Sequence, residues 1–180
     1  MTLRIAGVVK ESIVDGKGLR FVIFCQGCPH NCPGCHNPHT HDFEGGYEIE
    51  LDKIIDAIKK NPLLQGVTFS GGEPFCQAEA FAELGRKIKE IRGMKLDIMS
   101  YSGWTLEQLQ EKAKEDKGVS DLLSVCDYLV DGPFILAERD LTLRYRGSKN
   151  QRYIDLKKTF RRGEVILAPE HEVSERNRYK

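Results

Sequence analysis

Three cysteines on one short stretch of the chain have the residue type and the spacing that a metal cofactor requires. They form the pattern Cys28-x-x-x-Cys32-x-x-Cys35 in a sequence of 180 residues. Thiolates suit iron–sulfur clusters, and three of them packed this closely can reach three corners of one cubane. The fourth iron then lacks a protein ligand, so a small molecule can bind there and receive an electron, by the logic of an open catalytic zinc site. The pattern favours a [4Fe-4S] cluster held by these three cysteines.

Other ligand sets on the same stretch stay open. A structural zinc ion would use the three cysteines and one further ligand, and a cluster ligated by four cysteines is a third possibility. Three residues separate Cys25-x-x-Cys28 from Cys32-x-x-Cys35, whereas zinc signatures place a longer connection between their pairs. Cys25 also ends an apolar run, where a buried and inert thiol is common. The candidates for the further ligand are Cys25, His30, His36, His39 and His41.

A second pattern that could serve chemistry follows the apolar run at residues 66–70. It reads Gly71-Gly72-Glu73-Pro74, in which two glycines allow the backbone to approach a ligand closely and the proline stiffens the exit. Glu73 adds an acceptor for a positively charged group such as an amine. By itself this pattern also fits a plain turn between a strand and a helix.

The cysteine pattern resembles the signature of the radical S-adenosylmethionine (SAM) superfamily. Residues 15–21 and 68–74 are similar to segments of its glycyl-radical-enzyme activases, so the match extends over more than one motif. The resemblance implies a [4Fe-4S] cluster on three cysteines, SAM on the fourth iron, and the amino group of SAM at the glycine-rich turn. The residues that it implies for SAM binding are Gly34, His36, Gly71, Gly72 and Glu73, and the cluster ligands are Cys28, Cys32 and Cys35.

Residues 127–134 and 139–152 resemble the activases of anaerobic ribonucleotide reductases most closely. This implies that the protein generates a glycyl radical on an anaerobic ribonucleoside-triphosphate reductase. SAM is reductively cleaved, and the 5′-deoxyadenosyl radical abstracts a glycine hydrogen, with a low-potential donor such as flavodoxin reducing the cluster. Residues 36–38 are more similar to the activases of pyruvate formate-lyase, which remain an alternative. A zinc-stabilised binding protein is the alternative of another class.

The strands and helices that must position these residues alternate along the chain. Two helices are predicted by apolar residues at helical spacing near 51–58 and 81–91, and Thr105 with Gln108 predicts a capping box. The strand-then-helix order predicts an α/β fold with a mainly parallel sheet, and the number of units is too small for a closed barrel. We therefore expect a partial, open parallel β/α barrel of the radical SAM type, with both motifs on one rim. The predicted strands are residues 5–9, 19–24, 66–70, 96–100 and 127–131.

Charge and composition narrow the range of partners. Lys plus Arg and Asp plus Glu number 27 each, so the formal net charge is zero, which argues against a general nucleic-acid coat. No apolar window approaches the length of a membrane span, and residues 1–5 run into charge without a signal-peptide core. We expect a cytoplasmic protein with neither a nucleic-acid nor a membrane partner. It would have one domain over residues 1–157 and a partly ordered tail at 158–180.

Two further groups of polar residues have open interpretations. Residues 144–152 are rich in arginine, which fits a solvated basic loop, a surface for the reductase, or contacts to the carboxylate of SAM. Asp131 ends a predicted strand, where it would either orient SAM or the substrate loop, or cap the turn that follows.

Overall fold

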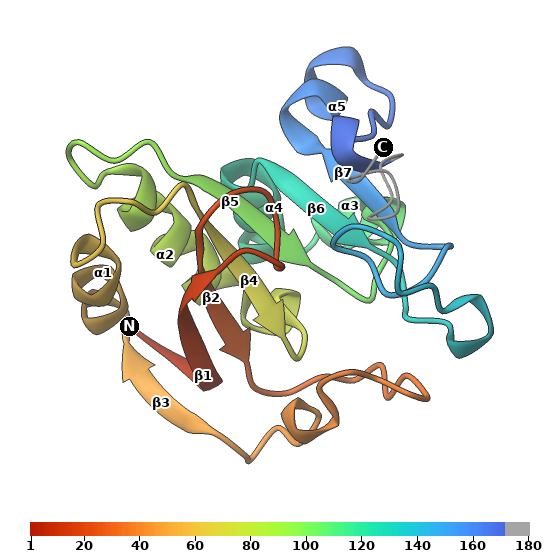
Figure 1. Cartoon of the computed structure of the whole chain (residues 1–180), viewed down its shortest axis with the longest axis horizontal. Coiled ribbons are helices and arrows are strands. Elements are labelled where there is room, and N and C mark those ends of the chain that lie inside the picture. Colours follow the sequence, from red (N-terminus) through yellow and green to blue (C-terminus); the bar gives the residue numbers. More distant parts are fainter. Residues whose placement is uncertain (172–180) are drawn as a thin grey trace.

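The computed structural model describes residues 1–171, which form one mixed seven-stranded sheet with helices packed on it (Figure 1). The strands are β1 Thr2–Ser12, β2 Arg20–Cys25, β3 Tyr47–Glu50, β4 Gly66–Gly71, β5 Asp97–Tyr101, β6 Tyr128–Asp131 and β7 Arg152–Asp155. The α-helices are α1 Leu51–Lys59, α2 Ala78–Lys89, α3 Leu106–Lys112, α4 Lys117–Val125 and α5 Leu156–Arg162. Short 3-10 helices are η1 Pro38–Thr40, η2 Pro74–Gln77, η3 Leu136–Glu138 and η4 Pro169–His171.

The strand order is β3-β1-β2-β4-β5-β6-β7, and the four strands from β2 to β6 in this order are parallel. Each parallel strand is added on the same side of the one before it. Because crossovers are right-handed, an order without reversal puts the connecting helices on one face, as in a barrel. Among the described residues β3 and β7 are the two edges, so the sheet does not close. The predicted α/β fold with a partial, open barrel is confirmed, although the edge pairings are antiparallel.

The hydrophobic core lies between the sheet and the helices. The predicted stripe on α1 is buried, from Leu51 to Ile58, and α2 buries Phe81 and Ile88 in the same way. Alternate strand residues such as Phe69 meet them from the sheet. The capping box that the sequence predicts at the start of α3 is present, with both of its reciprocal hydrogen bonds.

The opposite face of the sheet is polar where the parallel strands begin. Arg20 is 1% exposed, and its guanidinium donates to Thr68 Oγ1 at 2.7 Å and to Asp97 Oδ1 at 2.6 Å. It also donates to two backbone carbonyls, so each of its nitrogens has a partner. Gly66 makes room for it, because a Cβ there would lie 2.3 Å from Arg20 Nη1.

The C-terminal part continues from the sheet. The expected domain boundary after residue 157 falls inside α5, and Ile154 forms a β-bridge with Leu167. Glu170, in η4, pairs with Lys17 at 2.9 Å and joins this segment to the loop between β1 and β2. Residues 172–180 of the expected tail lie outside the described residues. None of the helices in residues 1–171 has the length and apolar character to cross a membrane.

Candidate active site

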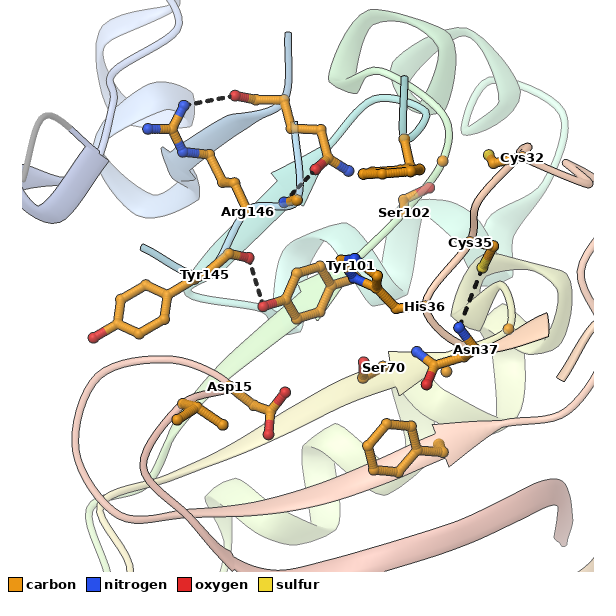
Figure 2. Close-up of a pocket in the computed structure, with 18 of the residues that line it drawn as sticks. Asp15, Cys32, Cys35, His36, Asn37, Ser70, Tyr101, Ser102, Tyr145 and Arg146 are labelled. Carbon is orange, nitrogen blue, oxygen red and sulfur yellow. Dashed lines mark hydrogen bonds between the residues drawn. The ribbon is translucent and has the colours of Figure 1, made fainter. Parts of the chain in front are cut away.

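A cavity of about 960 Å³ lies where the parallel strands end. Phe24, Ser70 and Tyr101 line it from three neighbouring strands, and the residues next to them along the strands, such as Ile23 and Phe69, point to the helices instead. The cavity is therefore on the face that the helices leave free. Loops complete its wall, and Figure 2 shows side chains from several of them turned towards one another. Those loops include residues 13–15, 28–41 and 141–147.

The cysteine loop and the glycine-rich turn meet on one rim, as the sequence predicts. Cys25 and Gly71 are register partners at the ends of β2 and β4, and Gly72 N donates to Cys25 O at 2.8 Å. A Cβ on Gly71 would lie 2.6 Å from Cys25 N, and one on Gly72 would lie 2.4 Å from Gly27 O. Glycine is thus required at both positions because the backbone at residues 25–27 lies so close to them. The two segments pack directly against each other there.

The three predicted cluster ligands line the cavity. Cys28, Cys32 and Cys35 are half-buried, and Cys35 N donates to Cys32 O at 3.1 Å. Asn37 N donates to Cys35 Sγ at 3.4 Å, a kind of bond that tunes iron–sulfur sites. Among the described residues no three His, Cys, Asp or Glu side chains gather as ligands of one metal ion. A cubane cluster does not require the three thiolates to meet at one ion, because each thiolate binds a different iron. Three soft donors on one wall of the cavity fit this requirement.

Cys25 points the other way. Its thiol is buried in the hydrophobic core, where Gln77 Nε2 donates to its sulfur at 3.1 Å. Burial raises the pKa of Cys25, and it raises the pKa of the Cys28 thiol to about 11. For Cys28 a bound iron would supply the positive charge that keeps the sulfur deprotonated. Cys25 has the environment of an inert thiol, and the role of Cys28 as a cluster ligand stays a prediction.

The five predicted SAM contacts divide into two groups. His36, Gly71 and Gly72 line the cavity, and the His36 ring lies 5.2 Å from that of Phe134. Gly34 and Glu73 are not among the lining residues in the described part of the chain. Contact of any of the five with SAM stays a prediction.

The local reasons for these two positions are clear. Gly34 has a φ of 74° and packs beside Leu136, where a Cβ would lie 2.9 Å from Leu136 Cδ1. Glu73 is 0% exposed, and both of its carboxylate oxygens accept hydrogen bonds from protein groups. Glu73 is therefore occupied within the protein, below the cavity surface.

A hydrogen bond between two tyrosines forms part of the wall that the sequence did not predict. Tyr101 Oη donates to the carbonyl of Tyr145 at 2.6 Å (Figure 2), and Tyr145 has the uncommon left-handed φ of 62°. Burial raises the pKa of Tyr101, so the phenol keeps its proton. The bond holds the 141–147 segment over the cavity. Its sequence signal is weak, because Tyr101 ends a strand where packing is the ordinary role of an aromatic residue.

The arginine-rich segment divides between structure and cavity. Arg152 contacts Asp131 at 2.5 Å and Glu107 at 2.7 Å, while Arg146 donates to backbone carbonyls. Asp131 also accepts a bond from the first turn of α3, so it ties α3 to β7. Arg144 and Arg146 both line the cavity. Arg152 and Arg146 hold the wall together, and Arg146 does so while it also lines the space inside.

Comparisons with known proteins find a 4Fe-4S family model and two kinds of activating protein. A family model described as a 4Fe-4S single cluster domain matches residues 14–154. The anaerobic ribonucleoside-triphosphate reductase-activating protein of Vibrio cholerae is 36% identical over 146 residues, which cover 77% of this chain and 89% of that protein. Its counterpart in Escherichia coli K12 is 33% identical over 145 residues, with 77% and 90% covered. The pyruvate formate-lyase-activating enzyme of Clostridium pasteurianum is 37% identical over 92 residues, covering 48% and 39%.

Proposed function

The chain belongs to the 4Fe-4S single cluster domain family, and within it to the radical SAM activases named anaerobic ribonucleoside-triphosphate reductase-activating proteins. From this membership we propose its reaction. The protein activates an anaerobic ribonucleoside-triphosphate reductase by generating a glycyl radical on it. One observation of the structure supports this most directly: the cysteine loop and the Gly71-Gly72 turn open into the same cavity. A cluster on the one is then adjacent to a cofactor on the other.

The cluster ligands in this proposal are Cys28, Cys32 and Cys35. A [4Fe-4S] cluster held by these cysteines would supply the electron that splits SAM into methionine and a 5′-deoxyadenosyl radical, which would take a hydrogen atom from the glycine. The chain's own residues hold and enclose the reactants, since the cofactor carries the difficult chemistry. Cys25 takes no part, because its sulfur lies in the core and is bonded by Gln77.

SAM occupies the cavity from the cysteine loop to the glycine-rich turn. The backbone of Gly71 and Gly72 receives its amino group, and the exposed ring of His36 stacks on adenine beside Phe134. The exposed flank of Gly34 adds a backbone contact. Glu73 acts on SAM from below the cavity surface, by fixing the turn on which the two glycines lie.

The two protein partners use different parts of the molecule. The glycine loop of the reductase enters the end of the cavity formed by the β1–β2 loop and residues 141–147. A low-potential donor such as flavodoxin reduces the cluster from outside the cysteine loop. We place the reaction in a reducing cytoplasm, where clustered cysteines stay available as metal ligands.

The test is an anaerobic activation assay. The protein is reconstituted with iron and sulfide, reduced, and mixed with SAM and the reductase, and a glycine-centred EPR doublet on the reductase is the expected result. SAM cleavage without that doublet would refute the assignment to this partner and leave the radical SAM chemistry standing. A colourless protein with one zinc and no iron would refute both, in favour of a zinc-stabilised binding protein.

A second candidate partner has one observation in its favour. The match to a pyruvate formate-lyase-activating enzyme covers 48% of the chain, although only 39% of that enzyme. Activation assays against both kinds of glycyl radical enzyme, at equal concentrations, separate the two. We expect the doublet on the ribonucleotide reductase and none on the formate-lyase.

A further inference from the structure

A histidine in the middle of the cysteine loop is hydrogen-bonded to the glutamate of the glycine-rich turn. His30 lies between Cys28 and Cys32, and its Nε2 is 2.7 Å from Glu73 Oε2. The His30 side chain is 15% exposed and the Glu73 side chain is fully buried. Because the acceptor is a carboxylate, the imidazole Nε2–H is the donor, in a charge-assisted bond shielded from water.

Glu73 is held from three further directions. Its Oε2 also accepts from Ser102 Oγ at 3.1 Å and from Gly103 N at 2.9 Å, both in the turn that follows β5. Its Oε1 accepts from Phe75 N at 3.1 Å, at the start of η2. Four donors from three segments converge on one carboxylate, so its position is fixed by the fold and the carboxylate can serve as an anchor.

The His30 ring is enclosed as well as bonded. The Trp104 ring lies edge-on to it with 4.7 Å between the centroids. Gly103 leaves the space that the ring fills, since a Cβ there would lie 2.4 Å from His30 Cδ2. The imidazole therefore has one well-defined position, and this restricts the position of the loop that carries it.

The loop itself has little regular structure to hold it. Asn31 takes the left-handed region at a φ of 49°, and the described residues 26–37 contain neither strand nor helix. Gly27 N and Cys28 N donate to the carbonyls of residues 40 and 41, and Gly27 O accepts from Glu73 N at 2.8 Å, so backbone bonds fix the start of the loop as far as Cys28. The His30 side chain makes the link from the Cys28–Cys32 interval to Glu73.

We propose that His30 is a positioning residue for the radical reaction, which fixes the Cys28–Cys32 turn against the Gly71-Gly72 turn through Glu73. It thereby sets the separation between the cluster and the SAM molecule held by the two glycines. This inference rests on the proposed function but concerns SAM binding and cleavage, which are measured without the reductase. A failure to activate the reductase therefore tests the proposed function and not His30.

The first test compares His30→Leu with His30→Gln. Leucine fills similar space without a donor, whereas a glutamine amide can still donate to Glu73. We expect His30→Leu to bind iron and sulfide in wild-type amount. The change that SAM produces in the EPR spectrum of its reduced cluster should be weakened or heterogeneous. Its kcat for SAM cleavage should fall by up to about a hundredfold, the loss that a misplacement of about 1 Å can cause. His30→Gln should recover most of both signals.

A second variant disturbs the same bond without altering either partner. Gly103→Ala keeps the backbone N–H that donates to Glu73, but its methyl group invades the place of the His30 ring. We expect the same spectral defect as in His30→Leu, and no further loss when the two changes are combined. Lys112→Met is the matched control, because it removes the cation 4.4 Å from the centroid of the Trp104 ring and alters neither His30 nor Glu73.

Three results would overturn the proposal. One is a wild-type EPR response to SAM, with wild-type kcat, in His30→Leu or in Gly103→Ala. Another is loss of the cluster itself in His30→Leu, which would mean that His30 is needed for ligation or folding. The third is a defect in His30→Gln as large as that in His30→Leu, because a role through the donated hydrogen bond predicts rescue.

Discussion

Two charged side chains are buried at opposite ends of the same sheet, Arg20 where the parallel strands begin and Glu73 beyond the point where they end. Each makes four hydrogen bonds. Each also needs a glycine that leaves space, Gly66 beside Arg20 and Gly103 beside the His30 ring that reaches Glu73. In both places a buried charge is tolerated because every nitrogen of Arg20 and both carboxylate oxygens of Glu73 have a hydrogen-bond partner.

The difference lies in what the two networks connect. Arg20 bonds to neighbouring strands and to the loop that leads into its own strand, all parts of one sheet. Glu73 bonds to the cysteine loop, to η2 and to the turn after β5. Removing the first should therefore cost stability of the whole fold, whereas weakening the second should cost alignment of the site. The buried charge of Arg20 stabilises the sheet, and that of Glu73 positions the loops of the site.

The largest expected effect comes from cysteines at the Glu73 end. Cys28→Ser, Cys32→Ser and Cys35→Ser should each abolish cluster binding and bring SAM cleavage to background, because three thiolates are the minimum for the proposed open cluster. The measurements are iron and sulfide content and SAM turnover after anaerobic reconstitution.

Matched serine variants exist within the same chain. Cys25 and Cys126 are buried in the core and Cys76 is exposed, and all three should keep the cluster when changed to serine. If Cys25→Ser lost the cluster while remaining folded, the site would have four protein ligands and no open iron. That outcome would contradict the SAM mechanism.

The sequence predicts the middle of the sheet and the helices on it better than it predicts the two edge strands. The apolar stripe of α1 and the strand before Gly71 follow from local periodicity, and the meeting of both motifs on one rim follows from parallel strands. Strands β3 and β7 are four residues each and lie at the edges, where pairing depends on tertiary context.

The partners of Glu73 were beyond sequence reasoning for a related reason. His30 and Ser102 are 43 and 29 residues away along the chain, and both reach the carboxylate through side chains in loops. The sequence predicts an acceptor at Glu73 but contains no local signal that the acceptor is buried. Such long-range polar contacts are decided by how the loops pack against one another.

The next largest effect concerns the scaffold end. Arg20→Met should lower the free energy of unfolding by about 3 kcal/mol, because Asp97, Thr68 and two carbonyls lose their donor inside the protein. Urea unfolding of the reduced apoprotein measures it. The remaining folded fraction should still bind a cluster and give a normal EPR response to SAM, which separates this network from the rim. If Arg20→Met had a normal urea midpoint but a defective EPR response to SAM, Arg20 would serve the site and not the stability of the fold.

A smaller effect tests the space beside Arg20. Gly66→Ala should destabilise the fold by about 1–2 kcal/mol, since its methyl group would meet the guanidinium at 2.3 Å. In an Arg20→Met background the same substitution should cost less, by at least about 0.5 kcal/mol, because a flexible thioether can move aside. Strict additivity of the two changes in urea unfolding would show that the glycine is required for some reason other than Arg20.

The smallest effect belongs to an ion pair that lies on the surface. Lys87 Nζ is 3.0 Å from Asp52 Oδ1, a length close to those of the buried pairs, but the Asp52 side chain is 80% exposed. The pKa of Lys87 is raised by its hydrogen bond to Asp52, yet water replaces the bond readily when one partner is removed. Lys87→Met should therefore leave the urea midpoint and the cluster spectra unchanged within error. A loss comparable to that of Arg20→Met would mean that proximity of charges, rather than their burial, determines the cost at both ends of the sheet.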